Sequence, residues 1–348
     1  MLEYFNNNNF YMYLIIFLSV ISVFLYFTIL KYKDFVGNFL NVMDKPNKKR
    51  KIHKKSIPKT ASYPILLIFL VYLSLNIFFG LFKSDYNLIL LGSICIFLVG
   101  FLDDRYDLSA SKKTLIISLI IIFACLINDE LIIKEFYLFH LDFFFKLQNF
   151  SIIFTVLCVL ALINALNLAD GINGLAIGII FFWLCYIFYI YGQKLEIIIY
   201  LVFANLLFSF YHNLKGYHFL GDAGSLMLSS FVAFLIIKLH NDNIWDPRHQ
   251  TSSENILIIF LIPILDMIRL FFERILNKKN PVSADNNHLH HLLLKKHSIG
   301  LCLVIYFSLI NIPILISLHT SIMKYSIIAS VIFIYTILVF YYKTFSKS

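Results

Sequence analysis

The sequence is poor in charged residues. Aspartate, glutamate, lysine and arginine together make up 14% of its 348 residues, whereas a soluble domain carries roughly 25%. Hydrophobic residues account for 60%, which is more apolar surface than a soluble protein of this length can bury. The composition therefore excludes an ordinary soluble enzyme and favours a protein that resides in a membrane.

Cysteine is also scarce, and no Cys-x-x-Cys spacing occurs. All five copies lie inside apolar stretches, so we expect reduced packing residues and neither disulfides nor a thiolate metal site: Cys95, Cys125, Cys158, Cys185 and Cys302. A long polar segment is missing too, because the longest gap, Lys31–Thr60, is too short to form its own core. One transmembrane domain over residues 1–348 is predicted. The absence of an obvious internal repeat counts against repeat-built transporters.

Long apolar runs recur from one end of the chain to the other. A bilayer core about 30 Å thick takes roughly 20 apolar residues of helix to cross, and backbone groups in lipid must pair within the helix. The first run lacks a basic flank and a cleavage site, so a removed signal peptide is not expected. The prediction is an all-α polytopic membrane protein with about eleven helices: Tyr11–Leu30, Ala61–Phe82, Leu88–Leu102, Thr114–Ile127, Phe150–Leu166, Leu175–Tyr191, Leu195–Tyr211, Ser225–Leu239, Asn255–Ile275, Ile299–Leu318 and Lys324–Tyr342.

The formal charge of +9 is unevenly distributed between the loops. With the N-terminus outside and alternating helices, most basic residues fall on one side, which the positive-inside rule assigns to the cytoplasm and which gives an N-out, C-in topology. We expect the basic run Lys45–Lys51 to lie against anionic lipid headgroups, and no nucleic-acid partner. The seven exceptions are Lys83, Lys134, Lys146, Lys194, Lys238, Arg248 and Lys324.

Carboxylates, histidines and asparagines gather in four clusters, and all four fall on the predicted cytoplasmic face. Their loops are distant in sequence, and a random scatter would have placed some on the outer side. One shared site near the inner membrane surface is the better interpretation. The clusters are Asp103–Asp107, Asn164–Gly171, Gly221–Ser225 and His288–His291.

Asp103 and Asp104 adjoin the end of the third expected helix. Adjacent carboxylates at a membrane interface repel each other unless a cation or strong donors separate them. Arg105 and Lys113 lie close by and could bind phosphate. The alternative is a pair of solvated loop acids.

Asn164, Asn167 and Asp170 follow the fifth expected helix at a spacing of three. On a continuing helix this spacing places them along one face. Three polar groups in register are costly in an apolar segment, which favours a functional row over an ordinary helix exit.

Asp222 lies among small residues just before the eighth expected helix. A free helix start can bind an anion through its N–H groups, and Asp222 could hold a bridging cation. Mg²⁺ fits, because it takes one or two carboxylates together with phosphate oxygens. The alternative is a plain N-cap.

His288, His290 and His291 lack the spacing of a helical zinc site. With the neighbouring lysines they are better interpreted as a cradle for a diphosphate or nucleotide. Asp266 and Arg269 lie deeper in the ninth expected helix, where a satisfied intramembrane pair is an equally good interpretation.

In their order, these motifs resemble the polyprenyl-phosphate N-acetylhexosamine-1-phosphate transferases of glycosyltransferase family 4. That family primes undecaprenyl phosphate for cell-surface glycan synthesis. The His-x-His-His form is similar to the N-acetylglucosamine-1-phosphate transferases of the enterobacterial-antigen, O-antigen (lipopolysaccharide) and teichoic-acid (cell wall) pathways. The resemblance covers nearly the whole chain and is carried by Asp44–Asn47 with Arg50–His53, Gly100–Ser109, Asn164–Leu175, Phe219–Leu226, and Pro263–Asp266 with His288–Leu293.

The resemblance implies an activity. A sugar-1-phosphate, with N-acetylglucosamine favoured over N-acetylfucosamine or N-acetylquinovosamine, would pass from a UDP-sugar to undecaprenyl phosphate with release of UMP. The enzyme would lie in the bacterial inner membrane with its site on the cytoplasmic face, and the resemblance allows a homodimer. The competing class is an anion or Mg²⁺ transporter, which predicts charged residues along a path to both faces.

The resemblance also implies residue roles. One of Asp103 and Asp104 would be the base for the lipid phosphate, and Asn167 and catalytic Asp170 would line the cleft. Asp222 would bind Mg²⁺, for which Mn²⁺ could substitute. The expected substrate-binding residues are Asn167, Arg105, Lys113, His288, His290 and His291.

Two departures from the family pattern stand out. Thr60-Ala61-Ser62 replaces the paired glycines that usually follow the basic loop, which weakens any inference of close backbone approach there. Asn173 stands where many relatives carry aspartate, so it is assigned no role.

Overall fold

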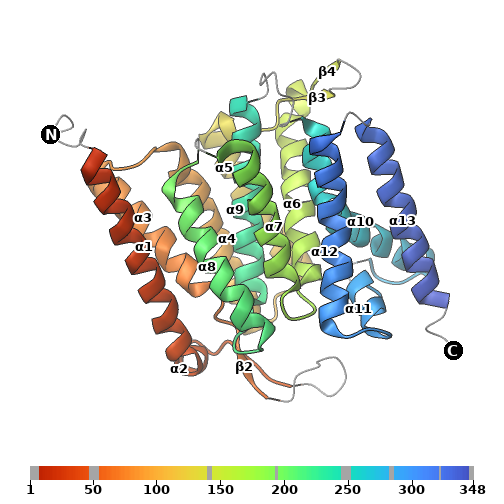
Figure 1. The fold of residues 1–348 in the computed structure, drawn as a ribbon, viewed down its shortest axis with the longest axis horizontal. Helices are drawn as coiled ribbons and strands as arrows, with labels where there is room; N and C mark the ends of the chain where they lie inside the picture. The colour runs from red at the N-terminus through yellow and green to blue at the C-terminus, as the bar shows by residue number, and fades with distance from the viewer. Residues whose placement is uncertain are drawn as a thin grey trace.

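The computed structural model describes residues 8–46, 55–138, 143–192, 195–243, 252–281, 286–320 and 323–344. Over these ranges the chain forms a bundle of helices that run between two ends of the molecule (Figure 1). The helices are α1 Asn8–Lys31, α2 Lys33–Phe39, α3 Tyr63–Phe79, α4 Asp85–Tyr106, α5 Ala110–Ile127, α6 Ser151–Ala169, α7 Leu175–Tyr191, α8 Ile197–Leu214, α9 Gly221–Asn243, α10 Ser253–Leu276, α11 Leu289–Leu294, α12 Ile299–His319 and α13 Lys324–Thr344.

The predicted all-α membrane fold is confirmed. Each of the eleven expected ranges coincides with a helix, and nine described helices are long and apolar enough to cross a membrane. The other two, α3 and α7, are apolar but shorter, with 17 residues each. The described strands form only two small antiparallel pairs, β1 Met43–Asp44 with β2 Ile57–Pro58 and β3 Glu135–Leu138 with β4 Phe143–Lys146.

Several helix ends differ from the apolar limits used to predict them. α3 ends at Phe79 because Gly80 adopts a left-handed conformation with φ 60°. α4 continues past the expected apolar limit at Leu102 to Tyr106, so Asp103 and Asp104, predicted at the end of this helix, lie in its last turn. α9 begins at Gly221. An apolar run marks only the part of a helix that lies in lipid, whereas its polar ends extend further.

The central helix of the bundle is α9. Its entire apolar window is buried, and α4 lies directly against its first turn. A Cβ atom built on Gly100 of α4 would lie 2.6 Å from both Ala223 Cα and Asp222 O. Real Cβ atoms essentially never come so close to backbone atoms, so the glycine permits this approach of the two helices.

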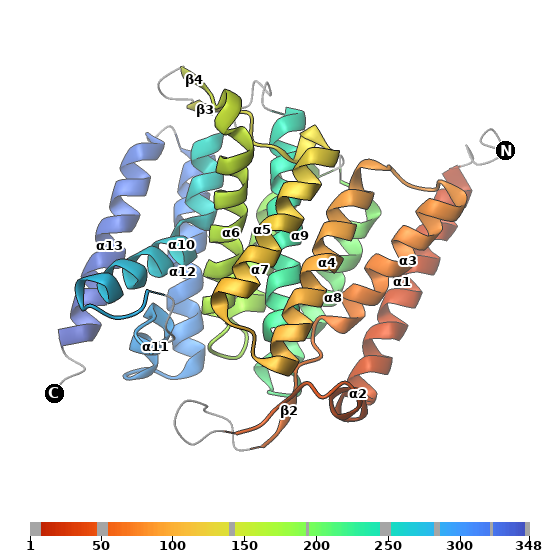
Figure 2. The same cartoon turned by 180° about the vertical axis from the view of Figure 1, so that it is seen from behind.

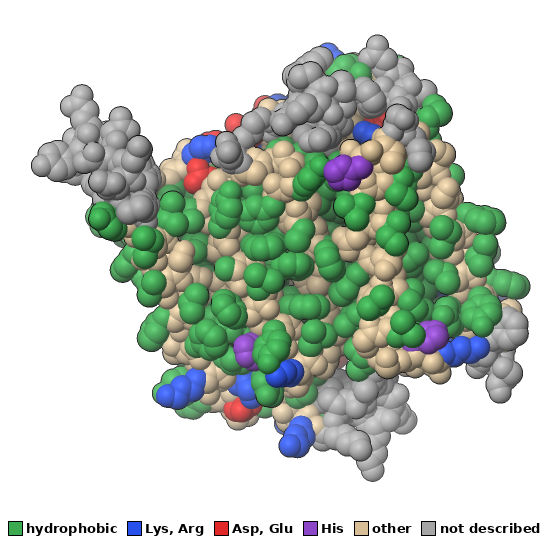
Figure 3. Space-filling view, in the orientation of Figure 1, with side chains coloured by type: hydrophobic (Ala, Val, Ile, Leu, Met, Phe, Trp, Pro, Cys, Tyr) green, Lys and Arg blue, Asp and Glu red, His purple; other side chains and the backbone are tan. Residues whose placement is uncertain are grey.

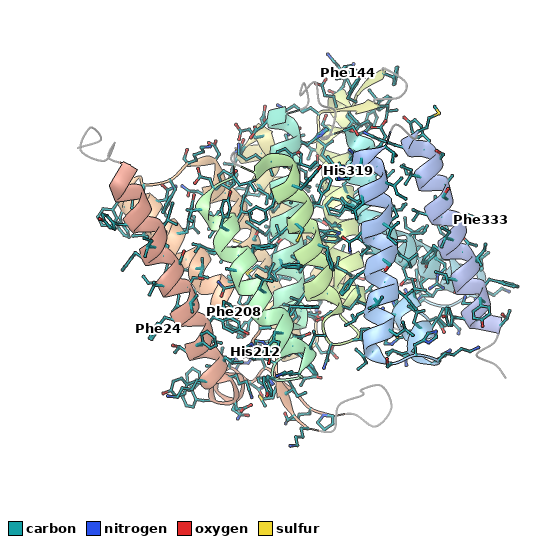
Figure 4. The ribbon with its side chains drawn as sticks, viewed as in Figure 1. Phe24, Phe144, Phe208, His212, His319 and Phe333 are labelled. Atoms are coloured by element: carbon teal, nitrogen blue, oxygen red, sulfur yellow. The ribbon has the colours of Figure 1, made fainter. Side chains whose placement is uncertain are left out.

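The outer helices expose an apolar surface between the two ends. Figure 3 shows hydrophobic side chains across the middle of the visible face and charged ones toward its upper and lower edges. Phe24 on α1 and Phe333 on α13 lie at opposite sides of the bundle (Figure 4), and each is 66% exposed. Such a band suits contact with lipid.

One end of the molecule carries the hairpin β3–β4, and the other carries α2, β2 and α11 (Figures 1 and 2). At the hairpin end, Lys238 of α9 pairs with Glu130 at 2.7 Å and with Asp85 and Asp242 at 3.4 Å. These contacts hold the hairpin end of α9 in place.

α10 changes direction along its length (Figure 2). Pro263 lies inside this helix, and proline cannot donate to the carbonyl four residues earlier. The indole Nε1 of Trp183 donates to that carbonyl, Ile259 O, at 3.1 Å. The side chain of Trp183 thus satisfies the acceptor that the kink leaves open.

The orientation in the membrane remains a prediction. We expect an impermeant maleimide to label Asn149→Cys in intact cells and to label Asp107→Cys only after permeabilisation, because these exposed positions lie at the hairpin end and the α11 end respectively. The five native cysteines are replaced first. Labelling of Asp107→Cys in intact cells would reverse the predicted N-out, C-in topology.

Candidate active site

Asp104 joins the end of α4 to the start of α9. Its Oδ2 accepts the backbone N–H of Ala223 at 2.9 Å, and its Oδ1 accepts the N–H of Asp222 at 3.1 Å and Lys59 Nζ at 2.8 Å. The side chain is only 1% exposed. The expectation that the N–H groups of this helix start are open to an anion is therefore wrong, since the Asp104 carboxylate already accepts two of them.

Lys113 bridges two other carboxylates. Its Nζ lies 2.6 Å from Asp103 Oδ2 and 2.8 Å from Asp222 Oδ2. The second oxygen of Asp103 accepts the N–H of Leu108 at 2.7 Å. The adjacent aspartates thus avoid repulsion by facing different cations: Lys113 for Asp103 and Lys59 for Asp104.

The end of α6 supplies the third side of this cluster. Asn167 Nδ2 donates to Asp222 Oδ2 at 3.4 Å, and Asp170 follows as the C-cap of the helix. Burial raises the pKa of Asp170 to about 7, with the nearby charges of Asp222 and Asp104 adding to the effect, while Lys59 and the backbone of Gly221 oppose it. Asn164 and Asn167 of the predicted helical row lie in α6, whereas Asp170 lies just beyond its last residue, so the row does not continue as a helix to Asp170. Asn164 donates to Leu160 O in its own helix.

The pKa of Asp170 predicts a pH-dependent stability. The unfolded carboxyl loses its proton near 3.8, whereas the folded one keeps it to about 7, so stability falls as pH rises across that interval and falls no further above it. Melting curves in detergent with a chelator, from about pH 5 to pH 8, should show this slope in the wild type and a smaller one in Asp170→Asn. The exposed Asp107→Asn serves as control. Equal slopes in all three proteins would contradict the expectation.

The histidine cluster meets the same region through the turn after α6. A Cβ on Gly171 would lie 2.3 Å from His290 Nε2 and 3.2 Å from His291 Nε2, so these rings lie directly against the turn. His290 is 1% exposed, and neither ring nitrogen has a hydrogen-bond partner within the described chain. Burial, followed by the neighbouring His291 and His288, holds the pKa of His290 well below its usual range. His290 is therefore a neutral ring, which can donate one hydrogen bond to a ligand or accept one from it.

All four polar clusters predicted to share a site thus converge at the α11 end of the bundle. Carboxylates come from α4, α6 and α9, two ammonium groups lie between them, and a neutral imidazole closes one side. Asp103, Asp104 and Lys113 are mostly buried, whereas the Asp222 side chain keeps 30% exposure. Such a site can bind anions and can hold or move a proton.

The donor set also suits a hard divalent cation, because Asp222 and Asp103 offer carboxylate oxygens that share a single lysine. In the structure the positive charge between the two carboxylates is the ammonium group of Lys113. Among the described residues, no three histidine, cysteine, aspartate or glutamate side chains are grouped as a preformed metal site. Two carboxylates with substrate oxygens and waters suit Mg²⁺, and Asp222, the more exposed of the two, would be the accessible ligand.

Comparison with known proteins identifies the family. Residues 86–240 match the model of glycosyl transferase family 4. A probable undecaprenyl-phosphate N-acetylglucosaminyl 1-phosphate transferase of Bacillus subtilis (strain 168) is 30% identical over 87% of this chain and 83% of that protein. The chain belongs to glycosyl transferase family 4.

Enterobacterial relatives with a similar name also match this chain. The undecaprenyl-phosphate alpha-N-acetylglucosaminyl 1-phosphate transferase of Escherichia coli (strain K12) is 29% identical over 80% of this chain and 76% of that protein. The protein of the same name from Salmonella typhimurium (strain LT2) is 30% identical over the same shares. The matched family region includes the carboxylate cluster, whereas Lys59 and the histidine cluster lie outside it.

Lys59 is a site residue of this family 4 transferase that the sequence interpretation missed. It follows several other basic residues in the sequence and lies four residues before α3 begins at Tyr63. Burial alone would lower its pKa, but the charge of Asp104, with further contributions from Asp44 and Asp222, outweighs burial and raises it. A lysine held among carboxylates in this way remains protonated.

The remaining residues singled out in the sequence lie outside the carboxylate cluster or outside the described ranges. Arg105 is exposed, and its guanidinium lies 5.2 Å from the Tyr106 ring centroid; no described hydrogen bond or ion pair links it to the carboxylate cluster. Asp266 and Arg269 form an ion pair at 2.8 Å, which was one of the two interpretations left open. The headgroup contact predicted for Lys45–Lys51 falls mostly on residues 47–54, outside the described ranges. The five cysteines are free, as predicted.

The structure also bears on the transporter alternative. Such a protein would carry charged side chains along a path between the two ends. In the central helix, the first turn holds Asp222 and the hairpin end holds Lys238, with only uncharged residues between them. The charged groups of α9 are thus confined to its two ends, which fits a site at one face.

Proposed function

We propose that this chain transfers N-acetylglucosamine 1-phosphate from UDP-N-acetylglucosamine to undecaprenyl phosphate. The observation that carries the proposal is the convergence of Asp103, Asp104, Asp170 and Asp222 with two lysines and a neutral histidine at one end of a membrane bundle. The names of the relatives support the sugar and the lipid acceptor. The site lies on the cytoplasmic face, where a soluble nucleotide-sugar and a lipid headgroup can meet, and the product starts a cell-surface glycan.

The bonds exchanged define what the protein must do. An oxygen of the acceptor phosphate forms a bond to the sugar-bearing phosphorus. The bond from that phosphorus to the oxygen bridging it to the uridylyl phosphate breaks, and UMP leaves with the electron pair. Both reactants are anions, so the site must reduce their repulsion and align the attacking and leaving oxygens.

The two lysines reduce the repulsion between the anionic reactants. Lys59 and Lys113 are each held at less than 3 Å from a carboxylate, which fixes their positions before substrate arrives. Preorganised charge of this kind stabilises developing negative charge without rearrangement. Mg²⁺, when bound at Asp222, would supply further neutralisation of the diphosphate.

Asp103 is the better candidate for the base. Both oxygens of Asp104 accept helix N–H groups, and its side chain is almost completely buried. Asp103 accepts one backbone N–H and a lysine that it shares with Asp222. Because the second pKa of a phosphate lies near 6, taking its last proton near neutral pH is an easy demand on a carboxylate.

The test is direct. Purified protein in detergent is given undecaprenyl phosphate and, separately, UDP-N-acetylglucosamine and other UDP-2-acetamido sugars, with and without Mg²⁺. We expect UMP release and a lipid diphosphate sugar with UDP-N-acetylglucosamine, and loss of both with a chelator. Failure to release UMP from every donor would contradict the proposal.

A further inference from the structure

Asp266, on α10, has more hydrogen-bond donors than a buried carboxylate needs for neutralisation. Arg269 Nη2 lies 2.8 Å from its Oδ1, and this ion pair alone would balance its charge. Its Oδ2 accepts His288 Nδ1 at 2.9 Å, and its Oδ1 also accepts the backbone N–H of Leu289 at 3.1 Å. The residue is 3% exposed. These two additional contacts both go to the segment that carries the histidines.

The last membrane helix takes part in the same network. Tyr335 of α13 donates its hydroxyl to Asp266 Oδ1 at 2.6 Å and accepts Arg269 Nε at 2.7 Å. Arg269 Nη2 also donates to Asn287 O at 2.8 Å. Residues 287, 288 and 289 are therefore each held by a group anchored on α10, and α13 braces that anchor from the other side.

The contact with His288 determines what this ring can offer. With Nδ1 bound to a carboxylate, Nδ1 carries the proton and Nε2 is the nitrogen available to a ligand. The His288 ring stacks against His290, with centroids 5.5 Å apart and planes 11° from parallel. His290 in turn lies against Gly171, next to Asp170. A chain of contacts thus leads from Asp266 to the carboxylate cluster.

We propose that Asp266 is a positioning residue, which fixes the orientation of His288 and, through ring stacking, of His290 for contact with the phosphates of the nucleotide-sugar donor. The inference rests on the proposed function, since it assigns the donor to the histidine segment. Carboxylate partners that orient a histidine are common behind reactive sites, and small displacements of substrate-contacting groups carry large kinetic penalties.

The experiment compares three variants in the transfer assay. Asp266→Asn keeps the shape of the side chain but replaces one acceptor oxygen with a donor. Tyr335→Phe removes one donor to Asp266 and leaves the histidine segment itself unchanged. Glu130→Gln is the matched control, because it removes a carboxylate 2.7 Å from buried Lys238 at the hairpin end. Donor KM, acceptor KM, kcat and melting temperature are measured for each.

A positioning role predicts a split between the two substrates. We expect Asp266→Asn to raise the KM for UDP-N-acetylglucosamine on the order of tenfold to a hundredfold, with little change in the KM for undecaprenyl phosphate. Tyr335→Phe should show a smaller rise in the same direction. Glu130→Gln should lower the melting temperature without moving donor KM.

Other outcomes distinguish a failure of the positioning role of Asp266 from a failure of the proposed transferase function. Unchanged donor KM in Asp266→Asn, or equal effects on both substrates as in a general loss of stability, would make Asp266 purely structural. If Asp266→Asn does not fold, unchanged donor KM in Tyr335→Phe overturns the inference instead. A wild-type protein that releases no UMP from any donor contradicts the proposed function itself.

Discussion

Replacing Asp222 with asparagine should lower kcat/KM for sugar-phosphate transfer on the order of 10²- to 10³-fold. Lys113 and Asn167 both donate to the same oxygen of this side chain. An asparagine in its place would lose the charge that balances the shared ammonium, and it could direct its own amide N–H at these donors. The proposed metal ligand would be lost as well.

The control for this change is Asp107→Asn. Asp107 is exposed and lies just after α4, where it adopts φ 55° as the helix C-cap. Asparagine tolerates that conformation, so activity should stay within about twofold of wild type. A second measurement needs no turnover: added Mg²⁺ should raise the melting temperature of the wild type and of Asp107→Asn, but not of Asp222→Asn. Identical behaviour of both variants would remove Asp222 as the cation ligand.

Gly100→Ala should destabilise the protein and abolish most of its activity. The new methyl group would lie 2.6 Å from Ala223 Cα and 2.7 Å from Ala223 N. These are backbone atoms of a buried helix, so the strain can be relieved only by separating α4 from α9. Overpacking of this kind costs roughly 1–3 kcal/mol or more, and the separation would pull Asp104 away from the N–H groups that it caps.

Gly300→Ala is the matched control for this substitution. Gly300 is the second residue of α12, and a Cβ there would meet nothing within 4 Å. Because alanine favours a helix over glycine by about 1 kcal/mol, this variant should melt at or above the wild-type temperature with full activity. The two Gly→Ala changes are thus expected to shift stability in opposite directions. A Gly100→Ala protein that melts like wild type and transfers normally would contradict the close packing of α4 on α9.

Composition and hydropathy were sufficient to predict the bundle, and the positions of the polar clusters predicted that these clusters meet. Lipid requires continuous apolar helices. Polar clusters at the same end of such a bundle must therefore lie close to one another. Asp103, Asp170 and Asp222 were found because each lies in a polar cluster that directly adjoins an apolar run. Lys59 was missed because it follows several other lysines, and nothing local distinguishes a lysine that folds back onto α4 from one that faces lipid headgroups.

Pairings between distant helices could not be derived from the sequence. Asp104 and Asp103 are neighbours with identical chemistry, yet one caps α9 and the other faces Lys113, because successive helical residues point in different directions. The partnership of Asp266 with Tyr335 spans 69 positions and joins α10 to α13. Tyrosine is common in this chain, with 21 copies, so no local pattern distinguishes Tyr335 from the rest.

The complete enclosure of α9 has a consequence for the lipid environment of the enzyme. Asp104 holds the first turn of this helix, and Lys238 with its three carboxylate partners holds the end near the β3–β4 hairpin. Peripheral helices such as α1 and α13 meet the acyl chains and accommodate a thinner or thicker bilayer by tilting. α9 has no such contact along its apolar window. The position of Asp222 at the start of this helix is therefore set by protein neighbours along the whole apolar window.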